Sequence, residues 1–309
     1  MLKYKDYIKL AYRIVGRMSK KELLEGVIDM HIHAGPDVVP RYADGLEIAR
    51  EAAQYCMRAL VFKPFIGFPN AQMCYMINKL VPEIKVFGGV ILNYAVGGLN
   101  PEAVFNAIQL EGTKVVWMPQ LDAEHCVKKS EQVKWYRDLG IAAKLGGIVV
   151  AKGGKLVPEA EEIINLLAEN KHIILATGHI SPEESLILIG DAKKAGVEKI
   201  IVTHVNAPLI GATLEEQKEM ARKGAYLEYS WCNCTPFFDR QDPAELVTGI
   251  KEIGAEHIVI TTDLGQPFVN PSPAEGMANF IACLLEKGVS KDEVDLMARK
   301  NPAKLLDLE

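Results

Sequence analysis

The sequence predicts a single-domain (β/α)8 TIM barrel, because apolar segments of strand length alternate with segments of helical period along most of the chain. Eight segments carry apolar residues on both faces, which is what buried parallel strands require. These segments are 27–31, 59–62, 86–92, 114–118, 173–177, 199–203, 225–229 and 257–261. The main structural alternative is an open doubly wound sheet, but no Gly-x-Gly-x-x-Gly motif follows an early strand.

Helices are predicted between the strands, and two of them begin with strong signals. Ser181-Pro182 and Asp242-Pro243 each place a capping residue before a proline at the first helical position. The predicted helices include 43–57, 158–170, 182–195, 214–223 and 243–253. A further segment, 146–157, predicts a hairpin around a Lys-Gly-Gly turn.

The N-terminal segment, residues 1–26, mixes apolar residues with lysine and arginine and predicts a helical extension to the barrel. Such a helix packs against the barrel or makes a dimer contact, so a homo-oligomer is one expectation. No linker-like stretch divides the chain, and we expect residues 1–309 to form one domain.

Composition narrows the classes of partner. The net charge of -5 argues against binding of nucleic acid, which needs clustered lysine and arginine. Neither a signal peptide nor an apolar stretch of about 20 residues is present, so we expect a soluble, cytoplasmic protein with no membrane partner. The six cysteines lack the density of a disulfide scaffold. Cys232 and Cys234 are one residue apart, unlike the usual Cys-x-x-Cys metal motif, and we expect buried thiols rather than ligands.

The histidines carry the functional signal, since four of the seven fall at the C-terminal ends of predicted strands, where barrel active sites form. His31 and His33 end the first strand, and strand alternation points both imidazoles to one side. His179 ends the fifth strand, His204 the sixth and Asp263 the eighth. Imidazole nitrogen and carboxylate oxygen suit a divalent ion, with Zn²⁺ as the first expectation and Fe²⁺ or Mn²⁺ as alternatives. Such an ion can activate a water molecule, whose proton Asp263 can pass to a leaving group.

This arrangement resembles the amidohydrolase superfamily of metal-dependent TIM-barrel hydrolases. That family carries His-x-His after strand one, a histidine after each of strands five and six, and an aspartate after strand eight. The segment 297–306, with its Asn-Pro-Ala sequence, also resembles the closing helix of these enzymes. The resemblance spans residues 29–306 and implies a hydrolase that acts on a small amide, lactone, other ester or amino-substituted ring. It does not identify a subfamily or a substrate.

One departure from the family pattern bears on the number of metal ions. Many binuclear members have a carboxylated lysine or a glutamate near the end of strand four, and the segment 113–120 has neither at its C-terminal end. We therefore expect one ion. Lys63, which ends the second strand, is a candidate catalytic residue, with three readings: a substitute bridge, an anchor for a substrate carboxylate, or a surface cation. Asp37 and Arg41 line the mouth or pair with each other.

Three further residues are candidates for binding the substrate. Asp122 and His125 lie in the loop after strand four, and Glu228 lies inside strand seven, where a buried carboxylate needs a charged partner. His172 and His257 precede strands and belong to the opposite end of the barrel, so we expect structural roles for them.

The leading hypothesis is thus an enzyme that hydrolyses a small molecule, and three alternatives remain open. A metal-dependent nonoxidative decarboxylase of a small carboxylic acid would use the same site, with Lys63 holding the carboxylate. A phosphoesterase acting on nucleic acid is disfavoured by the acidic composition. A noncatalytic metal-binding module would differ from all of these by the lack of turnover.

Overall fold

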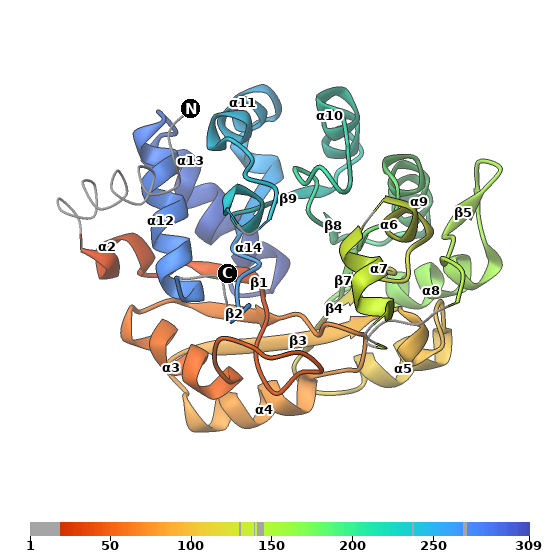
Figure 1. Cartoon of the computed structure of the whole chain (residues 1–309), viewed down its shortest axis with the longest axis horizontal. Coiled ribbons are helices and arrows are strands. Elements are labelled where there is room, and N and C mark those ends of the chain that lie inside the picture. The colour runs from red at the N-terminus through yellow and green to blue at the C-terminus, as the bar shows by residue number, and fades with distance from the viewer. Residues whose placement is uncertain (1–18, 130, 139, 141–144, 237, 268–270) are drawn as a thin grey trace. The chain divides into compact units, whose positions relative to one another are not determined.

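The computed structural model describes residues 19–129, 131–138, 140, 145–236, 238–267 and 271–309. Its eight parallel strands follow the order β1-β2-β3-β4-β7-β8-β9-β10, with helices between successive strands (Figure 1). This is the topology of a (β/α)8 barrel. The predicted fold class is therefore confirmed, and each of the eight predicted strands is present within two residues of its expected bounds.

The chain forms two compact units. Unit 1 consists of Met1–Lys63, Met73–Phe87 and Tyr229–Glu309, and unit 2 of Pro64–Gln72 and Gly88–Glu228. Two of the four boundaries fall inside strands, β3 (Lys85–Ile91) and β9 (Tyr226–Ser230), and the other two fall after Lys63 and inside the helix Ala71–Leu80. The single domain expected for residues 1–309 stays a prediction.

Unit 1 contains the first and last strands, which are buried at every position, as expected for strands covered on both faces. β10 lies beside β1, with a parallel bridge between Ile32 and Leu264. The strands of unit 1 are β1 (Ile28–Ile32), β2 (Ala59–Phe62), β10 (Ile258–Thr261), the first half of β3 (Lys85–Ile91) and the last two residues of β9 (Tyr226–Ser230). Its helices are α2 (Lys20–Leu24), α3 (Gly45–Gln54), α4 (Ala71–Leu80), whose first two residues belong to unit 2, α11 (Pro243–Ile253), α12 (Pro273–Glu286), α13 (Lys291–Asp295) and α14 (Asn301–Leu305), with shorter turns η2 (Cys232–Cys234), η3 (Ala255–His257) and the π-helical η4 (Leu296–Lys300).

Local sequence explains where several helices of unit 1 begin. Asp242 caps α11 by accepting a hydrogen bond from the Ala244 N–H, and Pro243 takes the first helical position, as predicted. At the end of the chain, Asn301 donates from Nδ2 to the carbonyl oxygens of Ala255 and Ile258, at 2.8 and 2.7 Å. The asparagine of the Asn-Pro-Ala sequence thus ties the closing helix to the start of β10.

Unit 2 contains the middle strands, and their ladder is parallel throughout. Its elements are η1 (Tyr94–Val96), α5 (Pro101–Ile108), β4 (Thr113–Trp117), α6 (Glu124–Lys129), α7 (Glu131–Asp138), β5 (Ala151–Lys152), β6 (Lys155–Leu156), α8 (Pro158–Glu169), β7 (Ile174–Ala176), α9 (Pro182–Ala195), β8 (Ile200–Val202), α10 (Leu214–Arg222) and β9 (Tyr226–Ser230). The predicted hairpin is confirmed, with Gly153 and Gly154 at φ +61° and +78° in its turn. Ser181 caps α9 in a capping box with Glu184, also as predicted.

β7 and β8 are each one residue shorter than expected at both ends, and threonine side chains account for the C-terminal ends. Thr203 N–H donates to Thr177 Oγ1 at 3.0 Å, and Gly178 N–H donates to Thr203 Oγ1 at 3.2 Å. Side-chain oxygens thus replace backbone acceptors at the ends of these two strands.

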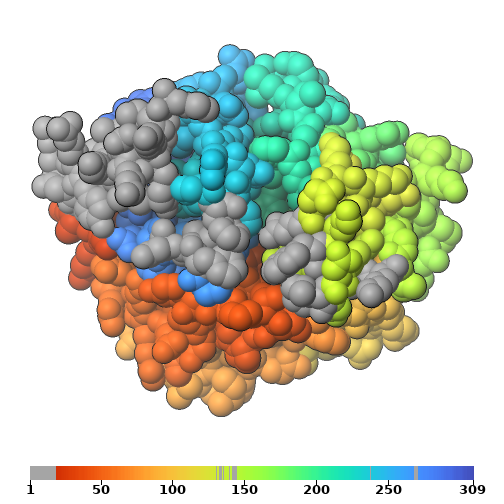
Figure 2. All heavy atoms as spheres, in the orientation of Figure 1, coloured from red at the N-terminus to blue at the C-terminus, as the bar shows by residue number. Residues whose placement is uncertain are grey.

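The predicted N-terminal helical extension lies mostly outside the described residues, which begin at Ser19. Within them, α2 follows a capping box formed by Ser19 and Glu22. None of the helices among the described residues is long and apolar enough to cross a membrane. In unit 2, α6 and α7 (yellow-green in Figure 2) are exposed on the face drawn.

Candidate metal centre

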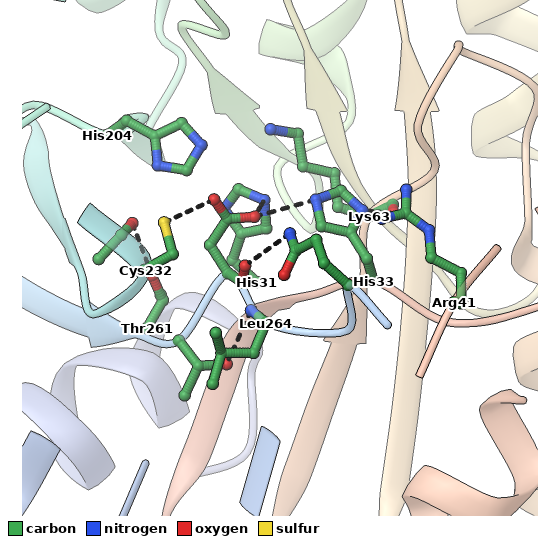
Figure 3. A network of polar contacts seen from close by, with 12 residues as sticks. His31, His33, Arg41, Lys63, His204, Cys232, Thr261 and Leu264 are labelled. Atoms are coloured by element: carbon green, nitrogen blue, oxygen red, sulfur yellow. Dashed lines mark hydrogen bonds and ion pairs between the residues drawn. The ribbon is translucent and has the colours of Figure 1, made fainter. Parts of the chain in front are cut away.

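Two of the predicted ligand histidines meet Asp263 in unit 1. The Nε2 atoms of His31 and His33 lie 3.1 and 3.0 Å from the same carboxylate oxygen, Asp263 Oδ1 (Figure 3). All three residues are buried. The backbone sets this arrangement, because Asp263 N–H donates to His31 O and His33 N–H donates to Leu264 O, each at 2.8 Å. The ends of β1 and β10 therefore bring the three side chains together.

The tautomer of His33 determines what can lie between these groups. His33 Nδ1 is 3.0 Å from the carbonyl oxygen of Lys63, which can only accept, so Nδ1 carries the proton. In the neutral ring, Nε2 then presents a lone pair toward Asp263 Oδ1, another lone-pair donor. Two such atoms face each other stably only across a cation, either a proton or a metal ion.

His33 is held in its neutral form. Burial and then the positive charge of Arg41 lower the pKa of His33 to about 3. Arg41 is itself paired with Asp37, with Nη2 and Nε at 2.7 and 2.8 Å from Oδ2, so the pairing expected for these two residues is found. A neutral imidazole with a fixed tautomer is the form in which histidine binds metal.

A buried aspartate, Asp29, holds the backbone that carries His31 in place through hydrogen bonds. Asp29 Oδ1 accepts hydrogen bonds from the N–H groups of His31 and Thr262, at 3.2 and 3.1 Å, and Oδ2 accepts from the Thr262 hydroxyl at 2.6 Å. Burial is the largest effect on the Asp29 carboxyl and raises its pKa to about 7, although these hydrogen bonds lower it. Asp29 thus joins the backbone of β1 to the segment after β10.

The turn that carries Asp263 is conformationally unusual. Asp263 has φ +50°, a left-handed conformation that is rare outside glycine. Two residues later, Gly265 has φ +127°, and a Cβ atom there would overlap the carbonyl oxygen of His33. The turn therefore aims the carboxylate at the histidines and needs glycine to pass so close to them.

Cys232 provides a partner for Asp263 that the sequence did not indicate. Its thiol Sγ donates to Asp263 Oδ2 at 2.9 Å, on the oxygen opposite the one that faces the histidines. Burial and the Asp263 charge raise the pKa of Cys232 well above its usual value, so the thiol stays protonated and remains a donor. Among the described residues, neither candidate metal group includes Cys232 or Cys234.

Lys63 lies directly after β2 and is 2% exposed. Its N–H donates to Ile32 O at 2.9 Å, and its carbonyl accepts the His33 ring proton. The backbone of Lys63 is therefore part of the site's framework. A role for its ammonium group stays a prediction.

Unit 2 brings together His204 and Glu228. His204 Nδ1 lies 3.3 Å from Glu228 Oε1, and both residues are buried. Val205 N–H donates to Glu228 O at 3.2 Å, so the backbones are also joined. His204 has φ +51°, a second left-handed residue after a strand. A carboxylate beside one ring nitrogen is a common arrangement around metal-ligating histidine.

His179 is the other predicted ligand in unit 2, and its ring centroid lies 5.2 Å from that of His204. Its Nδ1 is 3.4 Å from the Cys126 thiol, a contact that no sequence motif pointed to. Its N–H donates to Pro119 O at 2.9 Å. A Cβ on Gly178 would overlap the carbonyl oxygens of Met118 and Pro119, so glycine permits this close approach.

The predicted substrate residues of the loop after β4 occupy different settings. Asp122 is buried and accepts from the Tyr94 N–H at 2.9 Å, and burial raises its pKa while the Arg137 charge acts in the opposite direction. His125 Nε2 lies 3.0 Å from each of two backbone carbonyl oxygens, those of residues 209–210. This contact holds the His125 ring against the loop after β8.

The donor set in unit 1 fits a divalent ion. One ligand atom from each of His31, His33 and Asp263 lies within 4.8 Å of the other two, and all three residues are buried. Two imidazole nitrogens and a harder carboxylate oxygen form a mixed donor set that suits Zn²⁺, Fe²⁺ or Mn²⁺.

Comparison with known proteins identifies the family. A family model described as a family of unknown function, DUF6282, matches residues 26–228. The chain belongs to this family. No curated protein matches the DUF6282 chain in sequence.

Solved structures show the fold that the DUF6282 chain shares. An amidohydrolase from Pseudomonas aeruginosa has a TM-score of 0.61 and 15% identity, with 97% of this chain and 98% of that one covered. A lactonase from Listeria monocytogenes has a TM-score of 0.58 and 14% identity, covering 92% and 96%. A phosphotriesterase homology protein from Escherichia coli, complexed with phosphate in its active site, has a TM-score of 0.56 and 16% identity, covering 91% and 99%. The resemblance to the amidohydrolase superfamily is thus confirmed at the level of the fold.

Proposed function

We propose that this protein is a metal-dependent hydrolase of a small molecule. The observation that carries the proposal is the approach of two buried imidazole nitrogens, on His31 and His33, to one oxygen of Asp263, with the His33 tautomer set by Lys63 O. Because His33 Nε2 and the carboxylate oxygen present lone pairs to each other, a cation between them would stabilise the arrangement. The fold it shares with an amidohydrolase, a lactonase and a phosphotriesterase homologue supports the same conclusion.

The proposed ligands are His31, His33, His179, His204 and Asp263, around one ion that is most simply Zn²⁺. The assignment follows from the sequence, in which each of these residues comes at the C-terminal end of a predicted strand, the end at which (β/α)8 barrels carry their active sites. Glu228 is proposed to orient His204 through Nδ1, as carboxylates commonly do for metal-bound imidazole.

A bound divalent ion would polarise the scissile carbonyl or lower the pKa of water to about 7. Asp263 would take a proton from the attacking water and deliver it to the leaving group. Its Oδ2 is held by Cys232, which keeps the carboxylate from rotating. Lys63 would hold a negatively charged or carbonyl oxygen of the substrate, and Asp122 and His125 would line the loop side of the pocket. The substrates we propose are a small amide, lactone, other ester or amino-substituted ring, acted on in the cytoplasm.

Metal analysis of purified variants tests the ligand assignment. His179→Ala and His204→Ala should each lower the bound metal per chain, while Asp263→Asn should chiefly reduce turnover and keep the circular dichroism spectrum of the wild type. His172→Ala is the matched control, because His172 is exposed and precedes β7. Unchanged metal content in both histidine variants would reject the assignment.

Turnover on a panel of small lactones, esters and amides tests the reaction class. Hydrolysis in ¹⁸O-labelled water should place the label in the product carboxylate. Release of CO₂ from a carboxylic acid without incorporation of label would instead support the hypothesis of a metal-dependent decarboxylase. If the protein binds metal but turns over none of these compounds, the result would favour the alternative hypothesis of a noncatalytic metal-binding module.

A further inference from the structure

A second cluster of polar side chains, three of them buried and the fourth, Arg137, half-buried, lies in unit 2, beyond the predicted metal ligands. It consists of Asn93 after β3, Gln120 and Asp122 after β4, and Arg137 on α7. Asn93, Gln120 and Asp122 are 1%, 5% and 4% exposed. We name these four residues the β3–β4 cluster.

The backbone fixes which polar atoms of the cluster are already engaged. Asn93 Oδ1 accepts from the N–H groups of Gln120 and Asp122, at 2.9 and 3.3 Å. This assigns the amide, so Asn93 Nδ2 is its donor end. Asp122 Oδ2 accepts from the Tyr94 N–H at 2.9 Å, which leaves Oδ1 as the remaining oxygen.

Each of the four side chains keeps a buried atom with no hydrogen-bond partner in the part of the chain that the structure describes. The donors are Asn93 Nδ2 and, on Arg137, Nε and Nη2, and the acceptors are Gln120 Oε1 and Asp122 Oδ1. Arg137 Nη2 lies 3.8 Å from Asp122 Oδ1, which is too long for a hydrogen bond. Buried polar groups in folded proteins are nearly always satisfied, so this concentration of unsatisfied atoms indicates a binding group for something else.

The cluster is tied directly to a predicted metal ligand. Pro119, which precedes Gln120, accepts the His179 N–H at 2.9 Å. Cys126, four residues after Asp122, places its thiol 3.4 Å from His179 Nδ1. The segment 118–126 therefore contacts His179 at positions before Gln120 and after Asp122, which links the cluster to that histidine through a short stretch of chain.

The chemistry of the cluster selects a class of ligand. One positive and one negative charge are present, so a carboxylate ligand would gain from Arg137 but be repelled by Asp122. A neutral group with a carbonyl beside an N–H satisfies both halves, because the carbonyl accepts from Arg137 and Asn93 while the N–H donates to Gln120 and Asp122. An ester or lactone offers only acceptors and would leave Gln120 Oε1 and Asp122 Oδ1 unsatisfied.

We propose that the β3–β4 cluster is a specificity subsite that binds a neutral amide edge of the substrate, as found in a carboxamide, ureide or cyclic amide. This inference rests on the proposed hydrolase function. It adds that the substrate carries such an edge as a recognition element, whichever bond is cleaved.

Calorimetric titration of the metal-loaded protein with three probes of one carbon skeleton tests the subsite: succinamide, succinate and dimethyl succinate. Succinamide should bind at least about tenfold more tightly than either of the others. Gln120→Met and Arg137→Met should each weaken succinamide binding about tenfold or more, and Gln120→Met, which removes only an acceptor, should leave dimethyl succinate binding unaffected. Arg222→Met on α10, an arginine whose side chain is 68% exposed, is the matched control.

Asn93→Asp is the sharpest single variant. It keeps an oxygen that accepts from the two backbone N–H groups and replaces the donor with a second carboxylate oxygen, which adds a negative charge to a cluster that already holds Asp122, so succinamide binding should fall by a similar factor. Circular dichroism and metal content of each variant, measured separately, show whether the fold and the metal centre persist.

Several results would overturn the proposal. One is equal affinity for all three probes, and another is no binding of any probe to the wild-type protein. A third is a loss of stability in Arg137→Met with unchanged succinamide affinity, which would mean that Arg137 and Asp122 form only an ion pair. Failure of the proposed hydrolase function would show itself differently, as succinamide selectivity in a protein that retains no metal.

Discussion

The Cys232 thiol donates a 2.9 Å hydrogen bond to Asp263 Oδ2, while Asp263 Oδ1 faces His31 and His33. One carboxylate oxygen therefore accepts from a thiol, and the other faces the two imidazole nitrogens across the candidate metal position. Because the thiol is buried and protonated, it acts as a fixed donor rather than as a nucleophile.

Cys232→Ala should weaken metal binding about 10- to 100-fold, the usual effect of removing a group that orients a metal ligand. Cys232→Ser keeps a donor of similar size and should lose much less. Competition with a chromophoric chelator measures both affinities. Cys283→Ala, another buried cysteine, on α12, controls for loss of a thiol, and an equal effect in that variant would contradict the assigned role.

Asp29→Ala should both destabilise the protein and weaken metal binding. The variant leaves buried N–H groups of His31 and Thr262 without their acceptor, at a cost of about 1–3 kcal/mol for each group left unsatisfied. Asp29→Asn keeps one acceptor oxygen and should cost less. Urea unfolding and chelator competition measure the two effects, and an alanine variant as stable as the asparagine variant would argue against this bracing role.

Gly265→Ala should be far more damaging than Gly288→Ala. Both glycines have positive φ, so both variants carry a backbone strain of about 1–2 kcal/mol. A Cβ at position 265 would also overlap His33 O, whereas nothing lies within 4 Å of a Cβ at position 288. Thermal unfolding of the metal-free proteins compares them. Equal melting temperatures would show that the turn after β10 can relax away from β1.

Glu293 should contribute to stability in a pH-dependent way. Its carboxylate accepts from Lys251 at 2.7 Å and from the Ser290 N–H and hydroxyl at 2.7 and 2.8 Å, and the Lys251 bond leads in lowering its pKa from 4.5 to about 2. Because the folded-state pKa is depressed, the stabilisation is complete above about pH 4.5 and is lost as pH falls toward 2.

Glu293→Gln should therefore cost about 1 kcal/mol at pH 7, the usual scale of a lost cap interaction, and less at pH 3. Urea unfolding at the two pH values gives the difference. Glu83→Gln, at an exposed position before β3, is the control, and its difference in unfolding free energy from the wild type should not change between the two pH values. If the difference in free energy of unfolding between wild type and Glu293→Gln were the same at both pH values, the pH-dependent role of Glu293 would be refuted.

The sequence by itself determined the strands, the main helices and the candidate ligands. Strand and helix periods depend on near neighbours in the chain, so runs such as 258–261 and caps such as Ser181 could be predicted with nearly correct bounds. The five candidate ligands were found because each follows a strand, and parallel strands of a barrel end on one face.

Tertiary structure alone decided which side chains touch. Cys232 and Asp263 are 31 residues apart, and Asp29 and Thr262 are 233 apart, so no local spacing predicts either contact. The β3–β4 cluster has the same character, because Asn93 becomes informative only once its oxygen is seen to accept from residues that follow β4. Hydrogen bonds depend on distance and direction in space, and these emerge only when strands that are remote in sequence pack side by side.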